Sequence, residues 1–245
     1  MTIREWQKLA KEHLLQYFPG MTLSSRWLLY APIGWQVRGF AFEPSGFDKT
    51  MFTVYAGVLP LYVPQIPGLT FTERIGWLAK WQRGDTWWNL GQASADEVFA
   101  DIRKRIKQDA FPYLQQRATV DAMTKVRQHQ IIHLSDDRYV FQAMLCAGIL
   151  LDDARIVERE WQRFTVYHAR YAAPDTREWE AGLFQVTEHI YRQFHANPSA
   201  AREEIARWRQ EHAAELKFSA FLADEPDDLR DATRPRLRWF GRKGE

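Results

Sequence analysis

The stretch Leu28–Pro64, with the sequence LLYAPIGWQVRGFAFEPSGFDKTMFTVYAGVLPLYVP, decides the fold class. Two runs rich in Val, Phe, Tyr and Trp, Trp35–Phe42 and Met51–Pro64, flank the segment Glu43–Asp48. The Pro and Gly residues of that segment stop a helix and turn the backbone, so the two runs are predicted to form an antiparallel pair of strands. A short strand is also predicted at Trp27–Ala31.

Both faces of the predicted pair are apolar. By the two-residue period of a strand, Val37 and Ala41 lie on one face, and Phe40 and Phe42 lie on the other. A sheet that is apolar on both faces needs cover on both sides. The pair is therefore predicted to be the central layer, with an N-terminal helix on one side and later helices on the other.

Two helices of the first half have clear start signals. Thr2 is followed three residues later by Glu5, and Ser94 by Glu97, which is the spacing of a capping box. These pairs predict one helix from Thr2 to about residue 17 and another that begins at Ser94. Pro112 is predicted to interrupt the second helix and to open the next one.

The second half is predicted to be helical throughout. Its helices are expected at about residues 136–151, 153–171, 176–195 and 197–222. We therefore predict an α+β fold, with a small antiparallel sheet of about three to five strands flanked by helices, followed by an all-helical C-terminal part. The predicted organisation is an α+β domain at 1–130, a helical subdomain packed on it at 131–223, and a basic, flexible tail at 224–245.

Net charge, cysteine count and the N-terminal segment exclude several classes of protein. The net charge is +2, from 33 Lys and Arg against 31 Asp and Glu, so no global field holds the chain on nucleic acid or on an anionic membrane. The single cysteine, Cys146, excludes an internal disulfide and any site with several Cys ligands. The charged segment Met1–Glu12 lacks the apolar core of a signal peptide. We expect a cytoplasmic protein that does not enter membranes.

A pair of histidines has the spacing of metal ligands. His129 and His133 are four residues apart, which on a helix lets both imidazoles reach one ion. In the zinc-hydrolase motif the residue after the first His is a Glu that acts as the general base, whereas here it is Gln130, which cannot accept a proton. No third ligand is suggested nearby. We therefore predict ordinary histidines and no metal site.

Four carboxylates fall within a short stretch of the second half. Asp152, Asp153, Glu158 and Glu160 could serve acid–base or divalent-metal chemistry. However, an Asp at a helix start interacts favourably with the helix dipole, and the Glu residues alternate with Arg155, Arg159 and Arg163 at ion-pair spacings. The cluster is therefore interpreted as a solvated, charged helix face.

Two basic segments suggest nucleic-acid binding as a second alternative function. Residues 103–107 include four basic residues on one predicted helix, and the tail from Arg230 carries several Arg residues with Trp239 and Phe240. Such residues can grip phosphates and stack on bases. Carboxylates interspersed near both segments favour a solubilising role instead.

Residues 1 to about 127 resemble a family of bacterial domains of unknown function. The shared pattern is an N-terminal helix, a strand pair with GWQVRGFAFE and FTVYAGV, the segment TWWNLG, and a helix interrupted at AFPYL. Members of such families often resemble immunity proteins of bacterial toxin systems, which bind and block a partner. The resemblance implies a toxin-like protein partner and carries no functional residue with it.

The predicted function is therefore non-catalytic protein binding, of the immunity or antitoxin type. It rests on the resemblance, the Trp-rich composition and the lack of a recognisable catalytic motif. No catalytic residue, metal or cofactor is predicted. The predicted binding residues are of the kind that supplies interface hot spots, namely Trp35, Arg38, Trp87 and Trp88.

The alternative is an enzyme or a small-ligand-binding protein with a pocket between the sheet and the helical half. Its candidate residues are His133, His168, Glu158 and Asp153. This alternative requires that several of these side chains converge in one cleft with perturbed ionisation.

Overall fold

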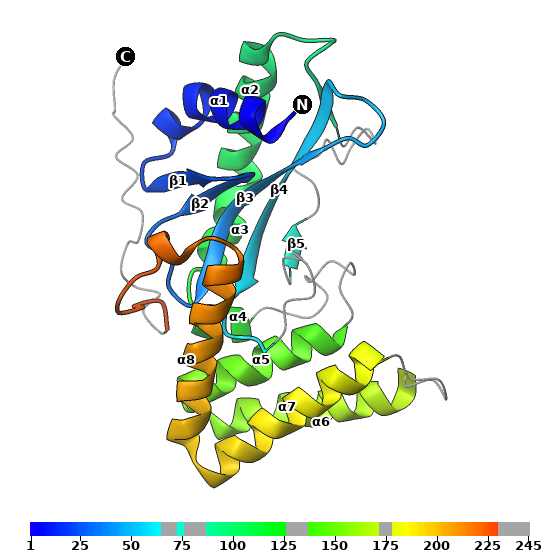
Figure 1. Cartoon of the computed structure of the whole chain (residues 1–245), viewed down its shortest axis with the longest axis vertical. Helices are drawn as coiled ribbons and strands as arrows, with labels where there is room; N and C mark the ends of the chain where they lie inside the picture. The colour runs from blue at the N-terminus through cyan, green and yellow to red at the C-terminus, as the bar shows by residue number, and fades with distance from the viewer. Residues whose placement is uncertain (65–72, 76–86, 126–136, 172–177, 230–245) are drawn as a thin grey trace.

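The computed structural model describes residues 1–64, 73–75, 87–125, 137–171 and 178–229. Its centre is an antiparallel sheet in which five strands follow one another in the order β1-β2-β3-β4-β5, and a short strand β6 pairs with the start of β4. The strands are β1 (Met21–Ser24), β2 (Trp27–Tyr30), β3 (Gln36–Pro44), β4 (Met51–Pro60), β5 (Glu73–Ile75) and β6 (Trp88–Asn89). The fold is α+β, as the sequence predicts (Figure 1).

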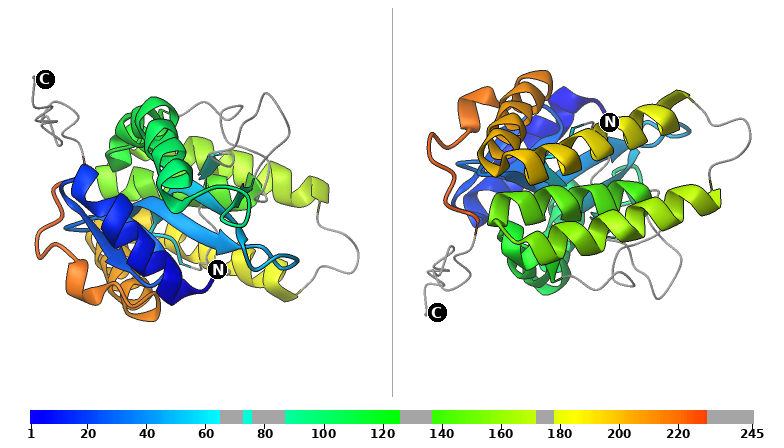
Figure 2. Two further views of the ribbon diagram at one scale, coloured as in Figure 1. Left: turned by 90° about the horizontal axis from the view of Figure 1, so that it is seen from above. Right: turned by 90° about the horizontal axis from the view of Figure 1, so that it is seen from below.

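The described helices flank the sheet and form a helical half below it (Figure 1). They are α1 (Ile3–His13), α2 (Ala95–Arg105), α3 (Phe111–Gln116), α4 (Val120–Thr124), α5 (Asp137–Leu151), α6 (Ala154–Tyr171), α7 (Glu178–Ala196) and α8 (Pro198–Glu215). Seen from below, α5 and α6 lie side by side with α7 next to them (Figure 2). Helix α8 runs from this helical half up along the sheet (Figure 1).

The β3–β4 ladder is the longest pairing of the sheet. Its register runs from Gln36 opposite Pro60 to Pro44 opposite Phe52. The alternation along it is the one that the sequence predicts, because Phe40 and Phe42 enter one core while Val37 and Ala41 enter the core on the opposite face. The prediction that the sheet needs cover on both sides is confirmed.

The first face of the sheet is covered by α1, α2 and α3 together. Trp6 of α1 stacks on Phe42 with ring centroids 5.1 Å apart, and on Phe99 of α2 at 6.1 Å. Phe111 of α3 meets Phe40 at 6.2 Å. Both predicted capping boxes, at Thr2 and at Ser94, are present at the starts of α1 and α2.

The second face of the sheet is covered by the end of α8 and the segment after it. Trp27 of β2 meets Phe218 edge-on at 6.1 Å. The sequence predicts that α8 continues to about Leu222, but the helix ends at Glu215. Lys217 adopts a left-handed conformation, with a φ of 60°, and the N–H of Phe218 donates to the carbonyl of Ala213 at 2.7 Å. This is a Schellman ending without the usual Gly, so the sequence gives no signal for it.

A buried arginine joins α8 to the turn between β2 and β3. The Arg209 guanidinium donates to the carbonyl oxygens of Gly34 at 2.7 Å, Ile33 at 3.2 Å and Ala223 at 2.7 Å. It also lies 5.6 Å from the centre of the Trp35 ring. One charged side chain of the helical half thus satisfies three carbonyls of the α+β part and its C-terminal cover.

Asp228 of the C-terminal segment binds the end of the same turn. Its buried carboxylate accepts from the N–H of Trp35 at 2.9 and 3.1 Å, and its carbonyl accepts from the N–H of Val120 at 2.8 Å. The flexible tail was predicted to begin at residue 224, yet residue 228 is buried and docked. Residues 230–245, with the Arg-rich part of the predicted tail, lie outside the described residues.

The two halves share one core across the predicted boundary at residue 130. Trp35 and Tyr62 of the α+β part pack in the same cluster as Cys146 of α5, Ile190 of α7 and Trp208 of α8. Residues of the helical part and of the α+β part thus belong to one core, and no break in packing separates the two parts among the described residues.

Replacing Gly39 by Ala is expected to lower the free energy of unfolding by about 1–3 kcal/mol. A Cβ at this position would lie 2.7 Å from the Leu29 Cα and would meet the Leu28 carbonyl oxygen, neither of which can move without disturbing the sheet. The matched control is Gly46→Ala, because a Cβ there meets nothing within 4 Å. Urea unfolding measures both, and equal midpoints for the two variants would contradict the close approach of β2 and β3.

Candidate functional site

The turn that joins β3 to β4 is held by its own side chains. Ser45 Oγ accepts from the N–H groups of Phe47 at 3.1 Å and Asp48 at 3.3 Å. The carboxylate of Asp48 accepts from both the N–H and the hydroxyl of Thr50, at 2.8 and 2.7 Å. These two hydrogen bonds from Thr50 stabilise the charged form and lower the pKa of Asp48 below its ordinary value of 3.8.

Two neighbouring segments support the turn from outside. The amino group of Met1 donates to the carbonyl of Lys49, and the N–H of Leu90 donates to the carbonyl of Thr50 at 3.1 Å. The turn is therefore tied to the start of α1 and to the segment around β6. Residues 45–50, together with Met1–Ile3 and Trp88–Leu90, are called the tip surface below.

Phe47 is the most exposed large apolar side chain among the described residues. Its relative exposure is 104%, so the ring makes no packing contact that shields it from water. Ile3, at the start of α1, is also 45% exposed. Single exposed apolar residues are common, but here the Phe lies on a turn whose backbone is hydrogen-bonded by the side chains of Ser45 and Asp48. The tip surface is therefore the candidate site of this protein.

Two of the four predicted binding residues lie at the same end of the ladder as this tip. Trp88 pairs with Phe52, and the two rings are 6.0 Å apart. Its indole N–H donates to Asp101 of α2 at 3.0 Å, which orients the half-buried ring. Trp87 precedes it and is also half-buried.

The other two predicted residues lie away from the tip. Trp35 is buried at the opposite end of β3, where it contacts Arg209. Arg38 is half-buried in the middle of β3, with its guanidinium 5.5 Å from the centre of the Tyr30 ring. Burial raises the pKa of Tyr30, and the charge of Arg38 opposes that rise. The four residues therefore do not form one surface.

Sequence reasoning missed Phe47 itself. The Pro and Gly of Glu43–Asp48 predict a turn, but they do not indicate that the Phe47 side chain points into solvent. The available signal was a lone aromatic residue in a segment of turn-forming residues, where nothing in the local sequence gives it a core to enter.

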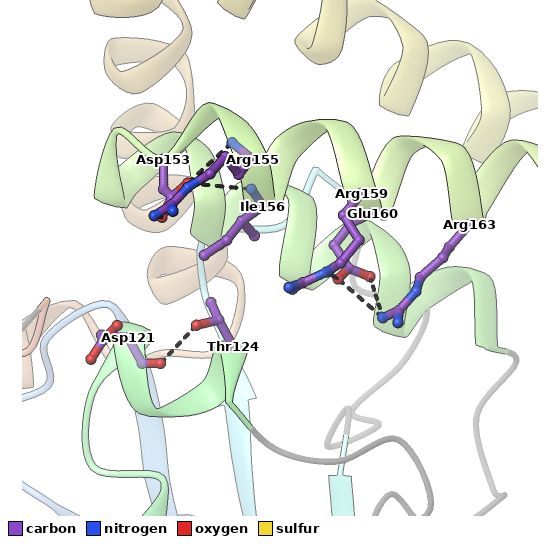
Figure 3. Close-up of polar contacts among 8 residues, drawn as sticks. All are labelled: Asp121, Thr124, Asp153, Arg155, Ile156, Arg159, Glu160 and Arg163. Atoms are coloured by element: carbon purple, nitrogen blue, oxygen red, sulfur yellow. Dashed lines mark hydrogen bonds and ion pairs between the residues drawn. The ribbon is translucent and has the colours of Figure 1, made fainter.

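The predicted acidic cluster separates into independent contacts. Asp153 accepts from the N–H of Arg155 at the start of α6, and Glu160 lies between Arg159 and Arg163 (Figure 3). Glu158 faces α7 instead, where it accepts from the Tyr191 hydroxyl at 3.1 Å and pairs with His195 at 2.8 Å. Asp152 lies 3.5 Å from Arg202 of α8. The interpretation as a charged helix face fits these contacts.

The three predicted pocket residues that the structure describes, Asp153, Glu158 and His168, interact with different neighbours. His168 stacks on Phe184 with ring centroids 4.6 Å apart, and Asp153 caps α6. His129 and His133 lie outside the described residues. Over the parts of the chain that the structure describes, no three His, Cys, Asp or Glu side chains are grouped to hold a metal ion. No described helix has both the length and the apolar character needed to cross a bilayer.

Comparison with known proteins gives no match to a family model, to a curated protein or to a solved structure. The resemblance noted in the sequence therefore stays a prediction, and the geometry of the chain itself carries the functional interpretation.

Replacing Thr50 by Val is expected to raise the pKa of Asp48 towards its ordinary value of 3.8, because the variant loses the hydroxyl that donates to the carboxylate. Carboxyl carbon NMR during a pH titration measures this. Ser45→Ala is the control within the same turn, since Ser45 Oγ accepts from N–H groups and donates no hydrogen bond to the Asp48 carboxylate. An unchanged titration of Asp48 in Thr50→Val would show that the turn is not held in this way.

Proposed function

We propose that this protein acts by binding another protein through the tip surface, with Phe47 as the anchor that enters an apolar pocket of the partner. The observation that carries the proposal is the full exposure of Phe47 on a turn held by its own hydrogen bonds and by two neighbouring segments. The tip needs no rearrangement to present the ring.

Burial of the Phe47 ring in a partner would contribute favourably to the free energy of binding. Burying a Phe side chain contributes about 1.5–3 kcal/mol, which alone changes an affinity by roughly 10- to 150-fold. Because the turn is already ordered, little conformational entropy is lost on binding. Aromatic side chains at the centre of an interface commonly supply a large share of its affinity.

Within protein binding, the more specific proposal is an immunity-type role towards a toxin. Its support is the resemblance of residues 1–127 to domain families that resemble immunity proteins. A protein of this type blocks its partner by covering it, which requires a surface and no catalytic group. Loss of protection against a toxin encoded nearby, on deletion of this protein, would support the specific role, and a partner without toxicity would contradict it.

Photo-crosslinking tests the site directly. Phe47 is replaced by p-benzoylphenylalanine in the full chain. The native cells that express this variant are irradiated, and the cross-linked products are identified by mass spectrometry. A defined protein adduct is expected at this position. The matched control is the same replacement at Tyr17, another exposed aromatic residue, in the 3₁₀ turn Leu15–Tyr17 that follows α1. No adduct at position 47, or the same adducts at both positions, would contradict the proposal.

Phe47→Ser is expected to weaken binding of the captured partner at least tenfold, by loss of the buried ring. The same variant should change the free energy of unfolding by no more than about 0.5 kcal/mol, because the ring is fully exposed. Isothermal titration calorimetry and urea unfolding measure the two quantities. If this variant bound the partner with wild-type affinity, Phe47 would not be part of the interface.

A further inference from the structure

The outer face of α6 carries four arginines. Its exposed residues between Ala154 and Tyr171 that point to one side at helical spacing are Arg155, Arg159, Gln162, Arg163, Val166, Ala169 and Arg170. None of these seven is acidic. Glu158 lies at the edge of the face and is held by Tyr191 and His195 of α7. These seven residues are called the arginine face below.

This face differs from the exposed faces of α1, α2 and α8. Exposed carboxylates accompany the basic residues on α1, α2 and α8, for example Glu12, Glu97 and Glu211. The chain as a whole is almost balanced in charge, at +2. The basic residues of the face are all Arg, whose guanidinium binds carboxylates in a fork geometry, whereas α1 carries Lys8 and Lys11 beside Arg4.

A buried carboxylate orders two of these arginines. Glu160 is 2% exposed and receives Arg159 Nε at 2.5 Å and Arg163 Nη1 at 3.2 Å, while the two arginine side chains remain 46% and 50% exposed (Figure 3). Their other guanidinium N–H groups make no hydrogen bond to the described residues. Two charged groups are thus fixed in place with donors left over, which lowers the entropy lost when they bind a ligand.

An apolar side chain lies among the arginines. Val166 is 66% exposed and falls between Arg163 and Arg170 along the helix. A phosphate backbone presents anions but no apolar group to cover such a side chain, whereas an acidic protein segment can present both. The mixture of a central apolar residue and surrounding guanidinium groups therefore favours a protein ligand.

We propose that the arginine face docks an acidic protein segment, whose carboxylates recur once per helical turn around an apolar side chain. Arg155, Arg159 and Arg163 of α6 follow one another at intervals of four residues, which places them about 6 Å apart along the axis and matches Asp or Glu at the same spacing on a second helix. The arginine face lies in the helical half, and the tip surface lies at the far end of the sheet (Figure 1). The two surfaces can therefore act independently.

The test uses the full chain and a fluorescein-labelled helical peptide with Glu at every fourth position and one central Leu. Fluorescence anisotropy compares wild type with Arg155→Gln/Arg170→Gln, a double variant that leaves both partners of Glu160 in place. The matched control is Lys8→Gln/Lys11→Gln, which removes the same charge from α1. We expect about a tenfold loss of affinity in the α6 variant and none in the control. Equal losses in both, or no loss in either, would overturn the proposal.

Two further measurements separate this ligand from other occupants. Val166→Ser should weaken peptide binding several-fold, and a single-stranded thymidine oligonucleotide of equal charge should bind less tightly than the peptide. An oligonucleotide that binds more tightly, and loses affinity in Arg155→Gln/Arg170→Gln, would assign the face to nucleic acid and overturn the proposal. Phe47→Ser should leave peptide binding unchanged, so failure at the tip surface remains distinguishable from failure here.

Discussion

The backbone ladder between β3 and β4 is the interaction on which the rest of the structure depends. Its register sends alternate side chains into two cores on opposite faces, one closed by α1, α2 and α3 and the other by the end of α8. A slip of one residue would exchange the two faces and place Arg38 where Val37 now packs. Gly39 allows β2 to approach closely enough to extend the same sheet.

The two ends of this ladder have different roles. At the end near Gln36, Arg209 and Asp228 bind the turn before β3 and join the helical half and the C-terminal cover to the sheet. At the other end the ladder closes in a turn whose backbone is fixed by Ser45 and by the Thr50–Asp48 contacts. One end of the ladder thus connects the sheet to the helical half, and the other end carries the exposed Phe47.

Regular features of this fold could be predicted from the sequence, because local chemistry determines them. The alternation of Phe40 and Phe42 with Val37 and Ala41 predicts both faces of the sheet, and capping boxes predict the starts of α1 and α2. The docking of Asp228 could not be predicted, because it depends on a partner almost 200 residues away, at a separation of 193. The sequence also does not predict which charged side chains of α6 are buried and which are exposed. The sequence predicts ion pairs for the arginines of α6, but it does not show that Glu160 is buried while its two arginine partners stay about half-exposed.

The most direct test of a rigid, outward-facing tip is backbone ¹⁵N relaxation across the β3–β4 hairpin of the free protein. Order parameters should stay at about 0.85, the level of rigid backbone, from Phe42 through Phe47 to Phe52. Values below about 0.6 at Phe47 would show that the turn is flexible before binding, and would contradict a pre-organised recognition surface.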